Sequence, residues 1–192
     1  MIPGHTSETR AFIPFGFFGK DNIVGNSCFS LPGATRFHFG VIQSAMHMAW
    51  VRYTCGRLKS DFRYSKDIVY NNFPWPELAP ELLSPGGEGS NKHRLAIETA
   101  AQAVLDARAR FPGSTLADLY DPLTMPPALV QAHHALDRAV DAAYIAAEKA
   151  AGRKPPKLGS DAERVAFLFE RYQALTSLLP AAKAKPGRRR KQ

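Results

Sequence analysis

The chain lacks the long apolar segments and the cysteines that mark membrane and secreted proteins. None of its runs approaches the ~18 uninterrupted apolar residues of a transmembrane helix. Residues 1–10 include His5, Glu8 and Arg10 and no apolar stretch, so they are not expected to be a secretory signal. Cysteine occurs only at Cys28 and Cys55, too few for a disulfide framework. We therefore expect a cytoplasmic protein with reduced thiols and no membrane partner.

Motifs for cofactor and phosphate chemistry are missing as well. The sequence contains no G-x-G-x-x-G, no G-x-x-x-x-G-K-[ST] and no G-x-S-x-G. The possible metal ligands that lie close together in sequence are Cys28, His38, His47 and Cys55. Their spacings match no zinc motif, and the adjacent His133 and His134 would point in different directions on a helix. We therefore expect this chain to hold no metal and no cofactor, and not to be an enzyme by itself.

Two local features have a structural and a chemical interpretation. A cysteine nucleophile would need a nearby base, but both cysteines lie in apolar sequence, which favours buried, inert thiols. Residues 71–76 (NNFPWP) hold the ingredients of an amino-methylating Asn-Pro-Pro-aromatic loop in the wrong order. We expect Trp75 to anchor a chain crossing, with base stacking as the alternative.

The net charge of +8 is unevenly distributed. Residues 1–80 hold 8 Lys/Arg and 5 Asp/Glu, residues 81–182 hold 11 and 12, and residues 183–192 hold 6 and none. Most of the excess therefore belongs to a tail, 181–192, that is expected to be disordered. Such a tail could contact phosphates without reading sequence, or it could simply be a solvated terminus. The basic composition by itself is no argument that the folded part binds DNA.

The pattern along the chain predicts an α+β protein in two parts. A small domain of mixed β-sheet and helix covers residues 1–80, and an α-helical bundle covers 93–180, after a Gly/Pro/Ser-rich linker over 81–92. In the first part we expect strands over 10–18, 22–31, 35–39, 57–64 and 67–70, and a helix over 40–55 that ends at Gly56. In the second part we expect helices over 91–111, 114–120, 126–151 and 160–179.

The long helices of the second part each carry one apolar stripe. The stripes are Ile97, Ala101, Val104 and Leu105; Leu129, His133, Leu136, Val140 and Tyr144; and Val165, Leu168, Tyr172, Leu175 and Leu179. Ser160 to Glu163 has the pattern of a capping box at the start of the last helix. Because no such helix can bury its stripe by itself, the helices are expected to pack on one another or on the first part.

The alternating segment Arg57–Tyr64 suggests a chemistry. If it is one extended strand, Arg57, Lys59, Asp61 and Arg63 share a polar face, and Leu58, Ser60, Phe62 and Tyr64 share the other face. In the major groove guanine offers the acceptors O6 and N7, and cytosine offers the N4 donor, so a Lys beside an Asp matches a G·C pair read from both bases. Arg63 could read a second guanine or hold a phosphate. The alternative is an ordinary solvated sheet face.

Four segments resemble the C-terminal part of MmeI-like restriction–modification enzymes. They are residues 13–35 (IPFGFFGKDNIVGNSCFSLPGAT), 37–77 (FHFGVIQSAMHMAWVRYTCGRLKSDFRYSKDIVYNNFPWPE), 114–127 (STLADLYDPLTMPP) and 160–176 (SDAERVAFLFERYQALT). Enzymes of this type IIL/IIG family join a nuclease, an adenine-N6 methyltransferase and a target-recognition domain in one polypeptide. The resemblance implies that this chain is the DNA target-recognition domain (1–80) plus the C-terminal helical domain of a prokaryotic, cytoplasmic enzyme. S-adenosylmethionine is then expected only in the methyltransferase domain that this chain lacks.

The resemblance also assigns residue roles. It implies that bases of double-stranded DNA are read by Asn26, Ser27, Lys59, Asp61 and Arg63, with Arg57 and Lys66 contacting the backbone. Family members often carry an acidic residue at the position of Lys59 and Arg at that of Asp61, so the reversed charges here predict reversed base polarity, with G preferred where an acidic–Arg pair prefers C. The alternative function is a helical docking module that holds the recognition domain to the catalytic domains.

Overall fold

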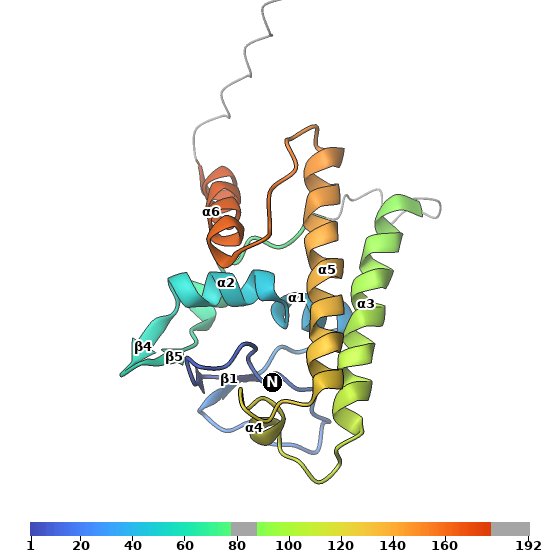
Figure 1. Ribbon diagram of the computed structural model, residues 1–192. Helices are drawn as coiled ribbons and strands as arrows, with labels where there is room; N and C mark the ends of the chain where they lie inside the picture. Colours follow the sequence, from blue (N-terminus) through green and yellow to red (C-terminus); the bar gives the residue numbers. More distant parts are fainter. Residues whose placement is uncertain (78–87, 178–192) are drawn as a thin grey trace, which may run out of the picture.

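The computed structural model describes residues 1–77 and 88–177, and its α+β architecture confirms the predicted fold class (Figure 1). Short antiparallel strands and short helices make up the first part, and long helices dominate the second. The basic tail over 181–192, Leu179 and most of the predicted linker lie outside the described residues.

The aromatic segments before residue 35 form less sheet than their composition predicts. Residues 10–18 are irregular, so the predicted strand there is wrong. Its buried side chains are Phe12, Ile13 and Phe15. Within 22–31 the strand is limited to Cys28–Phe29 (β3), which pairs with Ile2–Pro3 (β1). An apolar run indicates burial rather than sheet, and Pro14 cannot donate to a strand ladder.

Residues 35–54 form two helices, although the sequence predicts a strand followed by one helix. The N-cap residue of α1 (Arg36–Ile42) is Thr35, whose backbone N–H donates to the His38 ring at 3.2 Å. The N-cap residue of α2 (Ala45–Thr54) is Ser44, whose side chain accepts from the backbone N–H of His47. The predicted strand over 35–39 is therefore wrong: a capped helix turns its aromatic side chains into the core, and this packing overrides β-propensity.

A hairpin follows α2. β4 (Gly56–Leu58) pairs with β5 (Asp61–Arg63), and β2 (His5–Thr6) pairs with the other side of β5. Gly56 starts β4 and has no positive φ, so it is not the helix-terminating glycine that the sequence predicts. Figure 1 shows the hairpin projecting from the body of the molecule below α2.

The predicted strand over 67–70 is also wrong. Residues Lys66–Tyr70 form a single turn of π-helix, labelled η1. The Ser65 side chain caps it by accepting from the backbone N–H of Ile68 at 3.3 Å. A serine cap thus converts a β-branched run into a helical turn.

The helices of the second part agree with the predicted ones. They are α3 (Glu88–Ala109), α4 (Leu116–Leu119), α5 (Pro127–Ala150) and α6 (Asp161–Thr176). α3 starts at Glu88, so the last residues of the predicted linker are helical. The predicted stripe on α5 is fully buried along its whole length. On α6 Ser160 caps the helix by accepting from Glu163 N–H, but Leu175 is 59% exposed, contrary to its predicted place in the stripe.

The two parts share one hydrophobic core. α3 and α5 lie side by side and pack across α1, whereas α6 packs on α2 (Figure 1). The contact is closest at Gly40 of α1, where an added Cβ would lie 2.7 Å from Ile97 of α3. The Tyr144 hydroxyl on α5 donates to the Pro74 carbonyl at 2.7 Å, and buried Arg108 on α3 donates to the Phe15 carbonyl at 2.6 Å. The helices therefore act as a rigid support for the first part.

The structure also bears on membrane insertion and on metal binding. Among residues 1–77 and 88–177, no helix is long and apolar enough to cross a membrane. In the same part of the chain, His, Cys, Asp and Glu side chains form no group of three that could hold a metal ion. His133 is buried and His134 exposed, as their adjacent positions on a helix predict.

Candidate functional site

The N-terminal strand joins the two segments that the sequence singles out. The Gly4 N–H donates to the Ser27 carbonyl at 2.8 Å, and the Gly4 carbonyl accepts from the Tyr64 N–H at 2.9 Å. A Cβ on Gly4 would lie 2.7 Å from the Ser27 oxygen, so this close approach requires glycine. The Asn26–Ser27 turn and the end of β5 are therefore two strand spacings apart, about 10 Å.

The register of the three-stranded sheet decides which side chains face solvent. Phe62 is 2% exposed and points into the core, so its neighbours Asp61 and Arg63 point outward. Residues directly opposite one another share a face, which places His5 beside Arg63 and Leu58 beside Asp61. All four side chains are exposed. We call His5, Leu58, Asp61 and Arg63 the outward face.

The extended segment predicted over 57–64 is instead this hairpin, with Lys59 and Ser60 as its turn. The structure therefore contradicts the geometry in which Lys59 and Asp61 lie two positions apart on one strand. A hairpin is favoured because it pairs the backbone of both halves, which a lone strand could not do. Lys59 stands at the tip of the hairpin and Asp61 at the first position of β5, and both are exposed.

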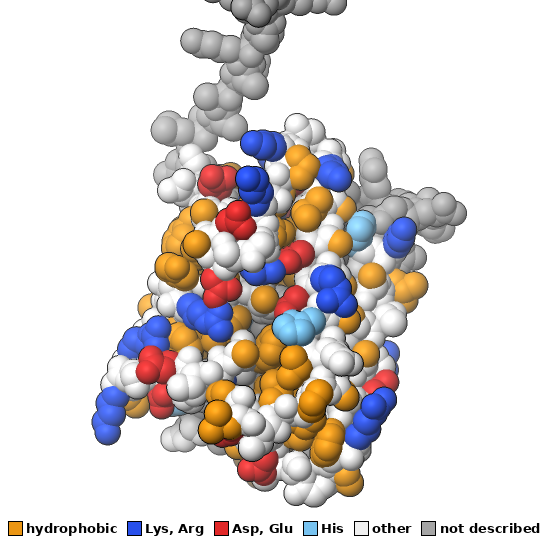
Figure 2. Space-filling view, in the orientation of Figure 1, with side chains coloured by type: hydrophobic (Ala, Val, Ile, Leu, Met, Phe, Trp, Pro, Cys, Tyr) orange, Lys and Arg blue, Asp and Glu red, His pale blue; other side chains and the backbone are white. Residues whose placement is uncertain are grey.

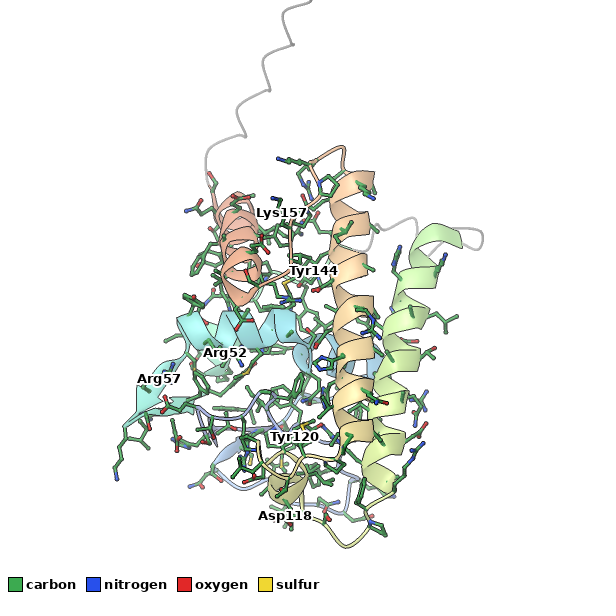
Figure 3. All side chains as sticks on the ribbon, viewed as in Figure 1. Arg52, Arg57, Asp118, Tyr120, Tyr144 and Lys157 are labelled. Atoms are coloured by element: carbon green, nitrogen blue, oxygen red, sulfur yellow. The ribbon has the colours of Figure 1, made fainter. Side chains whose placement is uncertain are left out.

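Arg57 does not share a face with Asp61 and Arg63 as predicted. It is opposite Phe62, and its guanidinium lies 4.1 Å from the centre of that ring. The same guanidinium donates to the Ser60 carbonyl at 2.7 Å and pairs with Glu8 at 3.3 Å. Figure 3 labels Arg57 on the projecting hairpin. These contacts stabilise the hairpin, and the contact of Arg57 with the DNA backbone stays a prediction.

The charged side chains at the hairpin tip differ in their partners. Within the described residues, the Lys59 and Arg63 side chains form no hydrogen bond and no ion pair. The Asp61 carboxylate accepts from the Glu8 backbone N–H at 3.3 Å through one oxygen. Lys66 pairs with the neighbouring Asp67 at 3.2 Å in an exposed position. Figure 2 shows basic and acidic side chains together where the hairpin projects.

A buried pair supports the hairpin from below. The Tyr64 hydroxyl, directly after Arg63, lies 2.9 Å from Nε2 of His47 on α2, and both residues are buried. Burial lowers the pKa of His47 to about 3 and raises the pKa of Tyr64, so both stay neutral near pH 7. Phe15 packs edge-on against Tyr64 with 6.1 Å between ring centres. The base of the hairpin is thus fixed to the helical body.

Asn26 and Ser27 occupy an exposed turn before β3. The Cys28 N–H donates to the Gly25 carbonyl at 3.1 Å and closes this turn. Their exposure is compatible with the predicted contact to bases, and the strand that holds Gly4 separates them from β5. The structure therefore places the two predicted reading segments in two small sheets, β1–β3 and β2–β5–β4, which Gly4 joins.

The remaining candidates of the first part have structural roles. Trp75 packs against Phe37, His38 and Tyr70, in agreement with a chain anchor. The Asn72 side-chain amide donates to the carbonyls of Asp67 and Ile68 at the end of η1. Burial raises the pKa of the Cys55 thiol to about 11, which disfavours the thiolate that a nucleophile would need.

Two residues of the outward face were not found by sequence reasoning. His5 lies far from the hairpin in sequence, and only the pairing of β2 with β5 brings it beside Arg63. A continuous strand predicts Leu58 on the inner side, but the two-residue turn places it opposite Asp61 on the outward face. An Lys-Ser pair between two short β-like runs is a weak hairpin signal, since Asn-Gly or Gly at the turn is the usual one.

Comparisons with known proteins identify both parts of the chain. A family model described as the MmeI target recognition domain matches residues 1–77, and one described as the MmeI C-terminal domain matches residues 89–180. DNA methyltransferase A of Bacillus subtilis (strain 168) is 38% identical over 176 residues, which cover 92% of this chain and 18% of that protein. The solved structure of the type IIL restriction-modification enzyme MmeI in complex with DNA is 44% identical, with a TM-score of 0.76, over 92% of this chain and 21% of that one.

The chain thus combines a target recognition domain with a helical C-terminal domain, and it spans about a fifth of the length of these two relatives. It belongs to the MmeI family.

Proposed function

We propose that this chain reads the sequence of double-stranded DNA, as the recognition module of an adenine-N6 DNA methyltransferase and restriction enzyme. The observation that carries the proposal is the projecting β4–β5 hairpin of a target recognition domain. It presents Lys59, Asp61 and Arg63 to solvent. Neither cation is neutralised by a described residue, so both are available to DNA.

The shape of the hairpin suits the major groove. That groove is about 12 Å wide and admits a two-stranded β-ribbon, whose strands are about 4.8 Å apart. The body of the molecule lies behind the hairpin and would remain outside the groove (Figure 1). The buried Tyr64–His47 contact keeps the ribbon from bending away as it meets the duplex.

The tip of the hairpin carries a hydrogen-bond donor, Lys59, and a hydrogen-bond acceptor, Asp61. Lys59 donates to guanine O6 and N7, and the free oxygen of Asp61 accepts from cytosine N4. An isolated carboxylate would be repelled by phosphates, but Asp61 lies between Lys59 and Arg63 in sequence and shares a face with Arg63. Arg63 reads a second guanine or holds a phosphate, with His5 beside it. Lys66 contacts the backbone near the end of the hairpin.

The chain is proposed to be non-catalytic by itself. Its sequence contains no cofactor loop and no methylating Asn-Pro-Pro-aromatic loop in the required order. S-adenosylmethionine binding, methyl transfer and cleavage would then belong to the methyltransferase and nuclease domains of a parent enzyme, which are its expected partners.

The helical half is proposed to hold the recognition sheet in a fixed orientation relative to those domains. Its ties to the first part are charged as well as apolar. The Asp137 carboxylate on α5 accepts from the Ala45 N–H at the start of α2 at 2.7 Å, and Arg52 on α2 pairs with Asp161 on α6. The alternative function, a helical docking module, is therefore compatible with DNA recognition by the first part.

A binding selection from random duplexes tests the function. We expect the 192-residue chain to enrich one sequence, and Lys59→Ala or Asp61→Ala to lose discrimination at one G·C pair by about 1–3 kcal/mol. The exchange Lys59→Asp with Asp61→Lys should reverse the preferred base at that pair. Lys154→Ala, an exposed lysine beyond α5, is the matched control and should change no base preference. Equal binding of all sequences by the unmodified chain would contradict the proposal.

A further inference from the structure

The outward face includes an apolar side chain among charged and polar ones. Leu58 is directly opposite Asp61 and is 54% exposed. His5 and Arg63 are the other neighbours on this face, and Gly56, opposite Arg63, contributes no side chain. Leu58 is therefore the apolar element in a set of groups that otherwise donate or accept hydrogen bonds.

Folding does not account for Leu58. It is absent from the buried core and from the partly buried residues packed against it. The Asp61 carboxylate opposite Leu58 cannot hydrogen-bond or pair with an aliphatic side chain, so this cross-strand pair does not stabilise the hairpin. Leu58 differs from Leu123, which is also exposed but lies in a loop with no proposed base-reading residue beside it.

We propose that Leu58 is a specificity-determining residue that contacts the C5-methyl group of a thymine. This inference rests on the proposed function and extends it to a second base pair. The thymine methyl is the apolar feature of the major-groove edges, and aliphatic contact is the way proteins read it. Side chains of an opposite pair have Cβ atoms about 4.5–5.5 Å apart, and successive base pairs of B-DNA are about 3.4 Å apart.

The geometry places that thymine next to the pair read by Asp61. A carboxylate on cytosine N4 occupies one base pair, and the neighbouring Leu58 then lies over the adjacent step on the same side of the ribbon. Cytosine carries hydrogen at C5, so the cytosine that Asp61 reads offers Leu58 no methyl group. Gly56, two positions before Leu58 on the same face of β4, has no side chain that would stand between Leu58 and the DNA.

Deoxyuridine substitution tests the inference without altering the protein. With the sequence enriched by the 192-residue chain in hand, each thymine is replaced in turn by deoxyuridine, which removes one methyl group. We expect about a fourfold loss of affinity at one thymine, adjacent to the G·C pair whose reading fails in Asp61→Ala. Leu58→Ala should lose about the same factor on the thymine duplex and show no further loss on the deoxyuridine duplex. Leu123→Ala, 94% exposed in the native chain, is the control and should keep the full methyl effect.

The outcomes separate this inference from the function it rests on. Equal affinity for thymine and deoxyuridine at every position overturns it, and so does a methyl effect that persists in Leu58→Ala. A loss that is uniform across all sequences also overturns it, because Leu58 would then act without reading a base. In each of these cases a surviving Asp61 effect leaves the proposed function intact. Failure to enrich any sequence refutes the function itself.

Discussion

Lys59 occupies a backbone conformation that its side chain disfavours. Its φ of 58° lies in the left-handed region, where the Cβ of a non-glycine residue approaches the next carbonyl at a cost of about 1–2 kcal/mol. The turn of a two-residue hairpin usually places glycine or asparagine at such a position. A lysine kept there points to a role of its side chain outside folding.

Glycine substitutions at the two turn residues isolate this cost. Lys59→Gly removes the left-handed penalty of about 1–2 kcal/mol, offset by the greater freedom of unfolded glycine, about 0.5–1 kcal/mol. Ser60→Gly meets the same unfolded-state cost but relieves nothing, because Ser60 has no positive φ. Lys59→Gly should therefore be the more stable variant by about 1–2 kcal/mol, or roughly 2–8 °C in Tm.

Urea denaturation followed by circular dichroism measures the difference, and equal m-values for the two variants validate the comparison. In DNA binding we expect Lys59→Gly, the more stable variant, to perform worse. It should lose discrimination at its G·C pair, whereas Ser60→Gly should retain it. If both glycines destabilise the chain equally, the argument from backbone strain is wrong. If Lys59→Gly is stabilised and still reads the same sequence, strain is real but Lys59 is not a reader.

Three other predictions concern stability. Gly40→Ala should destabilise the chain by about 1–2 kcal/mol in urea denaturation, since the new Cβ would lie 2.7 Å from a side-chain atom of α3; a stabilised variant would contradict this packing. Arg57→Ala should lower stability by about 1 kcal/mol through loss of its ring contact, and unchanged sequence preference in a binding assay would confirm that it reads no base. Lowering the pH from 7 to 5 should destabilise the chain by about 2 kcal/mol for each of His47 and His133, whose burial lowers the folded pKa to about 3, so that only the unfolded state takes up their protons. Asp137, whose pKa burial raises to about 6, takes up its proton in the folded state first and offsets about 1 kcal/mol; a stability that does not fall between pH 7 and 5 would refute the assignment.

The helical half could be predicted because its signals are local. The stripe of α5 recurs at helical spacing, and every residue named for it is fully buried. The exception on α6 is Leu175, which is 59% exposed although α6 packs on α2. An amphipathic period states which face is buried, but the partner decides how far along the helix burial continues.

The first part was harder to predict because apolar aromatic sequence does not distinguish strand from buried irregular chain. Phe12 and Phe15 are buried on a segment that forms no strand, and Phe39 is buried on a helix. Caps at Thr35 and Ser65 selected helical turns over extended chain, and such short-range hydrogen bonds outweigh weak β-propensity.

The sequence by itself determined the residue chemistry of the tip, the long helices and, through its resemblance, the family. The tertiary structure decided which of those side chains share a face. That decision rests on contacts between distant segments: β2 meets β5 across more than fifty residues, and Gly4 joins Ser27 to Tyr64. Strand register is set by such long-range pairing and by the turn, and a two-residue turn at Lys59 and Ser60 moves Leu58 to the outer side and Arg57 to the inner one.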